Sequence, residues 1–177
     1  MRAFIRKSLL FVAFIFSTGT APAAVLDGTG ATRTYQGSEL KLIGQGIRSK
    51  KFLVKFKVYE ISYFAANETK ALELKLLRDL DAEKIRHAFE EALKANSVDT
   101  KSPSIQDFFQ FVKASGEVKE GQTFRIVSKN ANHVIIENPQ GGTKEFEGSN
   151  IGGQILSIWF GTPVDDDMAE LKKVLLK

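Results

Sequence analysis

The sequence predicts an α+β domain in which the helices gather on one face of an antiparallel sheet. In several short segments apolar residues alternate with polar ones, the pattern of strands that bury one face. In other segments apolar residues recur every three or four positions, the pattern of amphipathic helices. Strand-like segments come first, followed by helices, more strands and two closing helices. An order in blocks of this kind is typical of the α+β class.

Strand-like segments make up the first block. They lie at residues 32–35, 40–43, 52–58 and 72–76. Phe52, Val54, Phe56 and Val58 occupy even-numbered positions and alternate with Leu53 and two lysines. After Val58 the apolar residues move to odd-numbered positions, beginning with Tyr59. A shift of one position turns the side chains to the other face of a sheet unless the backbone compensates. We therefore expect a β-bulge or a strong bend just after Val58.

The clearest helix is expected at residues 82–95. Its apolar residues at helical spacing are Ile85, Ala88, Phe89, Ala92 and Leu93. Asp81 is of a residue type that caps helix N-termini, and Asn96 is a suitable end for the helix. These signals agree on both the start and the end of the helix.

A second helix and a final block complete the predicted fold. The apolar stripe of the second helix runs from 105 to 112, and Ser104 with Asp107 resembles a capping arrangement at its start. Three strands follow at 123–128, 133–137 and 143–146, and then helices at 151–160 and 165–176. Short turns rich in Asn and Gly join these strands, so we expect the sheet to be antiparallel.

The N-terminus has the order of a cleavable export signal. Three basic residues precede an apolar run from 9 to 16, and Ala21-Pro22-Ala23 offers a small-residue cleavage site. The run is too short for a membrane-spanning helix, which needs about 20 apolar residues. We therefore predict a signal peptide at residues 1–23 and no stable membrane anchor after cleavage. The mature chain is expected to be periplasmic or secreted.

Residues 24–177 are expected to form one domain. A chain of roughly 150 residues that is rich in Phe, Ile, Leu and Val can bury a single core. The sequence has no cysteine, so its stability has to come from packing rather than from disulfides.

The charge of this domain argues against a nucleic-acid partner. The whole sequence has a formal net charge of +4, but without residues 1–23 there remain 22 basic and 21 acidic residues, a charge of about +1. A protein that binds nucleic acid concentrates positive charge on its folded surface. We therefore predict no nucleic-acid binding.

The sequence offers little for a metal or a cofactor. The two histidines, His87 and His133, cannot make a usual zinc site without cysteine, and we expect both to be ordinary surface residues. Asp165-Asp166-Asp167 lacks the spacing of a calcium loop and is expected to begin a helix, where the helix dipole favours acidic residues. Gly44-Gln45-Gly46 is only a fragment of a dinucleotide-binding loop. We predict no metal and no cofactor.

Three segments taken in order resemble one known family. They are GQGIR leading into FLVKFKVYEISYFA, then LKLLRDLDAEKIRHAFEEALKAN, and then GGQILSIWFGTPVDDDMAELKKVLL. Together they are similar to the bacterial, exported branch of the chalcone isomerase-like family, over roughly residues 37–176. The resemblance implies an open-faced β-sandwich, in which helices are layered on one face of a large antiparallel sheet and a ligand cleft lies between them. Members of this family include plant enzymes that close a flavanone ring and proteins that bind fatty acids.

The resemblance also implies candidate ligand-binding residues. In the plant enzymes an arginine follows a G-x-G-x motif at the cleft, and Arg48 matches it here. A guanidinium can pair with both oxygens of a carboxylate, whereas the alternative is that Arg48 only caps a strand or pairs with a nearby acidic residue. Tyr59 and Tyr63 could add phenol groups from neighbouring positions. The alternative for Tyr63, as for Phe52 and Phe56, is that it fills the core.

The remaining active-site positions of the plant enzymes do not carry over. At those positions this chain has Val58 or Lys57, Asp81, Ala88 and a residue near Ile158. The hydrogen-bonding set that orients the enolate is therefore largely missing. Chalcone isomerisation is not expected.

We expect a domain that binds a small apolar carboxylate, such as a fatty acid, without catalysis and with the head group at Arg48. One alternative is an isomerase or intramolecular lyase that acts on an unidentified small molecule. There Arg48 would stabilise an oxyanion, and Tyr59 or Tyr63 would donate a proton. Another alternative is a module that acts by contact with a second protein. The sequence leaves the oligomeric state undetermined.

Overall fold

The computed structural model describes residues 30–51 and 53–177 of the chain. The predicted signal peptide and Phe52 lie outside the described residues, so these two predictions are not addressed by the fold. All described strands, helices and core residues come after residue 29. A chain that begins at Ala24 therefore keeps every one of them.

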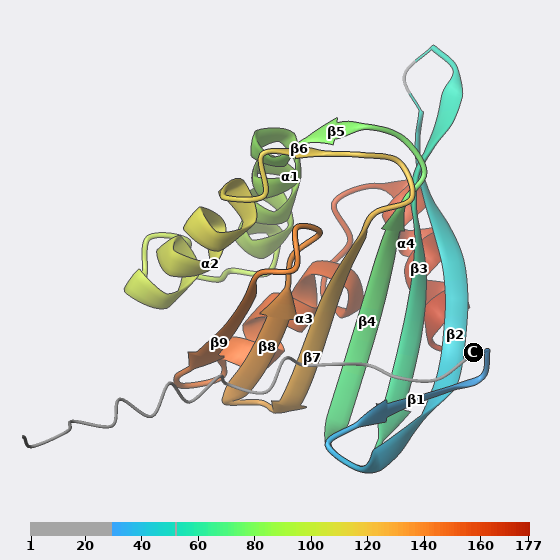
Figure 1. Cartoon of the computed structure of the whole chain (residues 1–177). Helices are drawn as coiled ribbons and strands as arrows, with labels where there is room; N and C mark the ends of the chain where they lie inside the picture. The colour runs from blue at the N-terminus through green and yellow to red at the C-terminus, as the bar shows by residue number, and fades with distance from the viewer. Residues whose placement is uncertain (1–29, 52) are drawn as a thin grey trace, which may run out of the picture.

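One antiparallel sheet of seven strands forms the centre of the molecule, in the order β1-β2-β3-β4-β7-β8-β9 (Figure 1). Its strands are β1 Thr32–Tyr35, β2 Ser38–Lys51, β3 Lys55–Ala66, β4 Thr69–Leu76, β7 Thr123–Asn130, β8 His133–Glu137 and β9 Thr143–Glu147. A short separate pair is formed by β5 Leu80–Asp81 and β6 Glu117–Val118. All neighbouring strands of the main sheet run antiparallel, which confirms the prediction.

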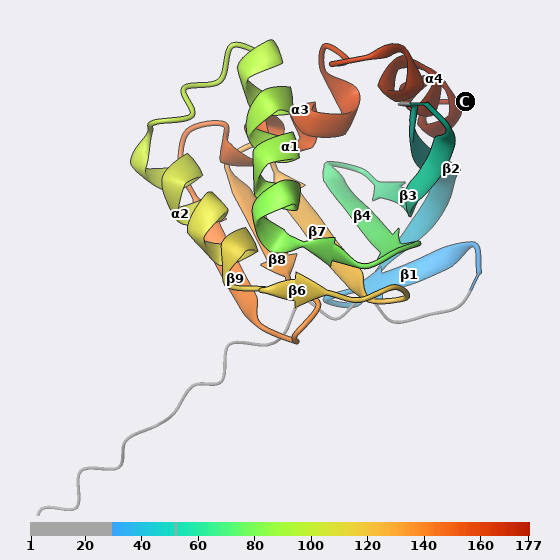
Figure 2. The same cartoon turned by 90° about the horizontal axis from the view of Figure 1, so that it is seen from above.

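Four helices lie against one face of this sheet, as Figure 2 shows from above. They are α1 Ala82–Ala95, α2 Pro103–Lys113, α3 Ile151–Phe160 and α4 Asp166–Leu175. Helix α4 packs along β2, α3 packs on β7 and β8, and α1 lies against α2 and α3. None of the helices in the described part of the chain has the length and apolar character needed to cross a membrane.

The helix boundaries agree with the sequence patterns except at α2. Asp81 caps α1 by accepting a hydrogen bond from the Glu83 amide at 2.7 Å, as predicted. The predicted capping arrangement of Ser104 is wrong, because α2 begins with Pro103, two residues before the start that a Ser104 cap would give, and its N-cap is Ser102. Proline favours the first position of a helix, where it has no amide hydrogen to lose.

The two faces of the sheet carry separate apolar clusters. The larger core lies between the sheet and the helices and includes Phe89, Phe108 and Trp159. The smaller cluster, on the outer face, consists of Tyr35, Leu40, Phe64, Ala71, Val127 and Ile135. Strand β1 crosses this outer face (Figure 1). There Arg33 pairs with Glu73 of β4 at 3.0 Å.

The predicted bulge is present between β2 and β3. Arg48 pairs with Tyr59, but the next pair joins Ser49 to Lys57, so Val58 is an extra residue in β3. The bulge keeps Val58 and Tyr59 together at the surface that faces the helices, since both line the same hollows described below.

Strand β2 is much longer than predicted, and two of its glycines explain the position of α4. A Cβ on Gly44 would lie 2.6 Å from the Leu175 carbonyl oxygen, and one on Gly46 would lie 2.7 Å from the Leu171 side chain. Glycine therefore lets α4 approach the strand closely. The close approach brings the start of α4 to the end of β2 that carries Arg48.

Candidate functional site

Two adjoining hollows between the sheet and α1 form what we call the apolar cleft. Their volumes are about 280 Å³ and about 100 Å³. The residues that line both are Lys50, Val58, Tyr59, Ala88 and Phe89. The larger hollow is otherwise lined by Phe56, Leu74, Leu76, Leu80, Ile85 and Phe124, together with Lys84. Its interior is therefore hydrocarbon, with lysines on two sides.

Arg48 lies at the smaller hollow and is only 7% exposed. Its Nη2 donates a hydrogen bond to Asp165 Oδ2 at 2.6 Å, and its Nη1 donates to the Ser49 carbonyl oxygen at 2.6 Å. The alternative that Arg48 pairs with an acidic residue is therefore realised. A guanidinium has five N–H groups, so these two bonds leave further donors beside the cleft.

Asp165 connects this arginine to the start of α4. Its Oδ1 accepts a hydrogen bond from the Met168 amide at 2.8 Å, which makes Asp165 the N-cap of the helix. Burial favours the neutral carboxyl group. Even so, the hydrogen bonds from Arg48 and Met168 hold the pKa of Asp165 below its ordinary value. Asp166 and Asp167 occupy the first turn of α4, which confirms that the three acidic residues begin a helix.

Tyr59 also lines the cleft and holds its proton firmly. Its hydroxyl oxygen accepts a hydrogen bond from Trp159 Nε1 at 3.0 Å. Burial raises the pKa of Tyr59 to about 12, and the Trp159 hydrogen bond and the charge of Arg48 only partly oppose this rise. At neutral pH the phenol can donate a hydrogen bond but is not a base.

Tyr63 is placed differently from the other two predicted site residues. It is 8% exposed, packs against the Phe160 ring at a centroid distance of 4.7 Å and belongs to the large core. Burial raises its pKa as well. Tyr63 lines neither hollow of the cleft, so its position fits the alternative that it fills the core. Phe56 is 37% exposed and lines the larger hollow instead.

Several cleft residues escaped the sequence analysis. Lys50 and Lys84 lie at the edge of the hydrocarbon lining, and neither belongs to a motif. Ala88 belongs to the apolar stripe of its helix, and its side chain is small next to those of Ile85 and Phe89. A small side chain at such a position leaves room under α1, and this is the one signal that could have indicated the cleft.

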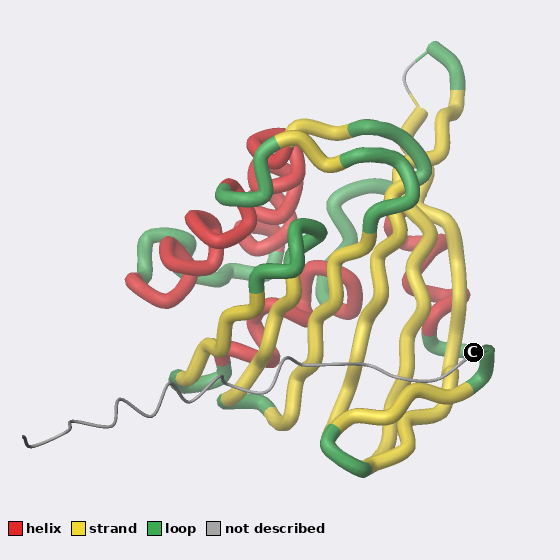
Figure 3. Tube along the Cα trace, viewed as in Figure 1, coloured by secondary structure: helices red, strands yellow, loops and turns green. Residues whose placement is uncertain are grey.

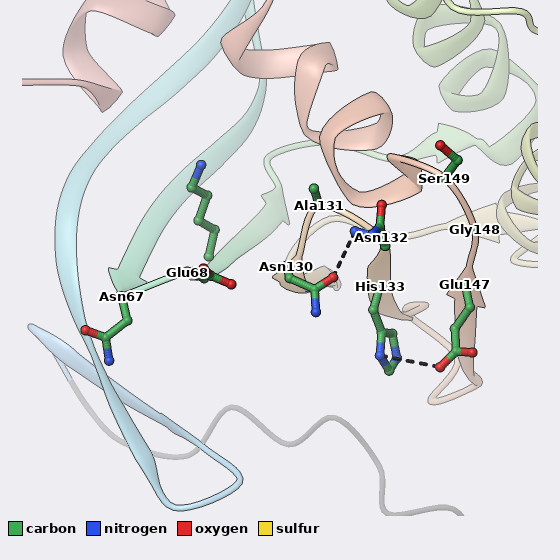
Figure 4. A pocket seen from close by; sticks show the side chains of 10 residues that line it. Asn67, Glu68, Asn130, Ala131, Asn132, His133, Glu147, Gly148 and Ser149 are labelled. Atoms are coloured by element: carbon green, nitrogen blue, oxygen red, sulfur yellow. Dashed lines mark hydrogen bonds and ion pairs between the residues drawn. The ribbon is translucent and has the colours of Figure 1, made fainter.

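Another hollow, separate from the cleft, lies at the far end of β3 and β7, and we call it the polar hollow. It has a volume of about 1130 Å³ and is formed by the turn at Asn67 and Glu68, the turn at 130–133 and residues 147–149 (Figure 4). The side chains around it are mostly polar or charged, and it opens widely to solvent. It offers little apolar surface to a ligand.

The two histidines have different surroundings. His87 is exposed on α1 near Glu91, as predicted. His133 at the polar hollow is half-buried, and its Nδ1 lies 3.6 Å from Glu147 (Figure 4). Its Nε2 lies 3.0 Å from Glu145. His133, Glu145 and Glu147 bring one potential ligand atom each within 4.8 Å of one another.

Comparison with known proteins places this geometry in context. The sequence model of the chalcone isomerase-like family matches residues 28–177. No curated protein sequence matches the chain. Among solved structures, the fold is similar to that of a fatty-acid binding protein of Arabidopsis thaliana, with a TM-score of 0.61 and 14% identity over 88% of this chain and 90% of that one. At this identity the likeness shows the fold alone, and it confirms the predicted open-faced arrangement of sheet and helices.

Proposed function

Because the chain belongs to the chalcone isomerase-like family, we propose that it binds a small apolar carboxylate, such as a fatty acid, in the apolar cleft and does not transform it. We further propose that it does so after export, as a periplasmic or secreted member of the family. The basis for export is the signal-peptide pattern of residues 1–23.

The observation that carries this proposal is the hydrocarbon lining of the cleft. Each methylene that leaves water contributes about 0.8 kcal/mol, so an acyl chain gains affinity without any specific polar contact. The two hollows together lie near the lower end of the volumes of small-molecule sites, roughly 300–1,000 Å³. An acyl chain of moderate length fits this space best.

The head group belongs at the Arg48 end of the cleft. Arg48 and Lys50 line the smaller hollow together with Glu91, and Tyr59 can donate from its hydroxyl group. Asp165 already neutralises part of the charge of Arg48. The carboxylate of a ligand would therefore share this arginine with Asp165 rather than have it alone.

The same lining argues against catalysis. Val58, Ala88 and Ile158, which stand at or near positions where the plant enzymes carry hydrogen-bonding side chains, all line the cleft and are all apolar. Tyr59 keeps its proton at neutral pH and so does not supply a base. The cleft provides a place to hold a ligand more clearly than a set of groups to react with it.

The Ala88→Phe variant tests the proposal. A phenyl ring that enters the hollow and displaces about two methylenes of the ligand removes about 1.6 kcal/mol, which is more than a tenfold loss of affinity. The protein is purified from Ala24 onward and inspected by native mass spectrometry for a bound acyl ligand. It is then stripped of lipid and titrated with dodecanoate by calorimetry.

His87→Phe is the matched control. The side chain of His87 is the next one on α1, is 64% exposed and does not line the cleft. We expect this variant to bind like the parent. An empty protein that gives no heat with dodecanoate, or equal binding by both variants and the parent, would contradict the proposal. Turnover of a small molecule that Ala88→Phe abolishes would favour the enzyme alternative.

A further inference from the structure

The tip of the hairpin that joins β2 to β3 exposes two large apolar side chains. Leu53 is 89% exposed and Val54 is 75% exposed, the highest exposures among the large apolar residues of the described chain. Figure 3 shows this hairpin rising beyond the rest of the sheet, away from the other loops. Neighbouring apolar side chains that point into water mark a surface that meets another apolar phase.

Lysines surround this tip on both strands. They are Lys50 and Lys51 at the end of β2 and Lys55 and Lys57 at the start of β3, and all four are exposed. Arg78 adds a fifth positive charge, with its guanidinium 4.7 Å from the centre of the Phe56 ring. Asp167 offsets part of this charge by pairing with Lys55 at 3.0 Å. The tip and its flanks therefore remain positively charged.

We propose that this lysine-flanked tip docks on the surface of an anionic lipid bilayer, with Leu53 and Val54 inserted between the head groups. Apolar side chains that enter the interface, surrounded by long cationic ones that stay at the head groups, are the pattern of proteins that lie on membranes. A protein partner fits less well, because lysine is depleted from the buried centres of protein interfaces.

The register of the hairpin links this tip to the cleft. The last ladder pair joins Lys51 to Lys55, and the next joins Lys50 to Phe56. Lys50 and Phe56 line the larger hollow. A docked tip therefore brings the mouth of the cleft to the lipid surface, where an acyl chain could pass between bilayer and protein. This transfer rests on the proposed function, whereas the docking does not.

Vesicle binding tests the docking directly. The chain from Ala24 onward is mixed with vesicles of phosphatidylcholine alone or with 30 mol% phosphatidylglycerol, and bound protein is measured by co-sedimentation. We expect binding to the anionic vesicles only, and weaker binding at high salt. Two double variants, Leu53→Ser with Val54→Ser and Lys51→Glu with Lys57→Glu, should each bind at least tenfold more weakly. The first removes the apolar side chains that enter the bilayer. The second removes two lysines, each of which contributes about fivefold near an anionic surface.

Matched changes away from the tip serve as controls. Val174→Ser with Leu176→Ser removes two apolar side chains that are 39% and 53% exposed, and Lys101→Glu with Lys173→Glu reverses two exposed lysines. Both should bind vesicles like the parent. Docking is overturned if the parent binds neutral and anionic vesicles alike, or if the tip variants bind as well as the controls.

A separate titration with dodecanoate, without vesicles, shows which of the two proposals fails. Tip variants that bind dodecanoate like the parent but not vesicles support docking as an independent property. A parent that binds vesicles through its tip but takes up no dodecanoate leaves docking in place and contradicts the proposed function.

Discussion

The apolar cleft and the polar hollow lie at opposite ends of the same strands, and they differ in how they are built. The cleft is lined by the inner faces of β2, β3, β4 and α1, which also supply the core of the molecule. The polar hollow is lined by turns such as the one at 130–133 (Figure 4). The polar hollow is the larger of the two in volume, yet its walls give an apolar ligand little to contact.

We place the proposed ligand in the cleft because the nature of the wall, rather than the size of the space, determines the affinity for an apolar ligand. Burial of apolar surface drives the binding of apolar ligands, and of these two spaces the cleft offers more of it. Most walls of the cleft also belong to the core, so changes to them should cost more stability than changes at exposed turns. Changes around the polar hollow should be nearly neutral for both stability and binding.

The largest expected effect of this difference is on stability. Gly44→Ala places a methyl group 2.6 Å from the Leu175 carbonyl oxygen, so α4 has to move away from β2. Overpacking of this kind costs about 1–3 kcal/mol. Chemical denaturation should therefore show a lower free energy of unfolding, and dodecanoate should bind more weakly because α4 carries Asp165 to the Arg48 end of the cleft.

Ser149→Ala at the polar hollow is the control for Gly44→Ala. Ser149 is exposed, and a surface change of this kind usually alters the free energy of unfolding by less than about 0.5 kcal/mol. Equal stability of the two variants would break the comparison, since it would mean that the contact of α4 with β2, which brings Asp165 to the Arg48 end of the cleft, is no more tightly packed than the turns.

The sequence predicted the elements of the cleft better than their lengths. Helix α1 was predicted at its observed bounds because Asp81, the apolar stripe and Asn96 are all local signals. The bulge at Val58 was predicted from the shift in alternation. The second half of β2 was missed because Gly44 and Gly46 weaken a strand pattern. Glycine is needed at both positions because α4 approaches the strand closely there, a contact between residues far apart in the sequence.

The residues that line the candidate cleft could be predicted only in part, for physical reasons. Resemblance pointed to Arg48, but its partner Asp165 lies 117 positions away and no local pattern joins the two. Tyr59 and Tyr63 share a strand face, so alternation could not tell that only Tyr59 reaches the cleft. Whether a residue on this face lines the cleft or fills the core depends on its position along the strand and on the helix that covers it. Periodicity does not contain that information.

A smaller effect is expected from the length of the ligand. If hydrocarbon walls determine binding, each added methylene should strengthen it by about 0.8 kcal/mol, or about fourfold, until the cleft is full. Calorimetric titration with saturated fatty acids of increasing length should show this rise and then a plateau. Affinity that is independent of length would show that the head group alone is recognised. The Ala88→Phe variant should reach its plateau at a shorter chain than the parent.

The smallest expected effect concerns the charged end of the cleft and its dependence on pH. The pKa of Asp165 is lowered in the folded protein, so its contribution to stability is fully present above the unfolded value near 3.8 and is lost as the pH falls through the folded value. Asp165→Asn keeps a side chain that can cap α4 but removes this titration. The stability difference between parent and variant should therefore shrink below about pH 4 in denaturation experiments. Glu147→Gln at the polar hollow, where the side chain is 75% exposed, should change stability by less than about 0.5 kcal/mol.

The same Asp165→Asn variant also separates the two roles of Arg48. If a ligand carboxylate shares this arginine with Asp165, removing the competing charge should raise the affinity for dodecanoate by roughly twofold to fivefold, because a charged acceptor binds a guanidinium more strongly than a neutral amide does. If Arg48 serves only to hold α4 against β2, the affinity should stay the same or fall together with stability. Arg48→Ala alone would not distinguish these cases, since it leaves Asp165 without its partner and disturbs the fold in both. A rise in affinity with a simultaneous loss of stability at neutral pH therefore assigns the head group to Arg48, and it does so in a variant whose cleft walls are unchanged.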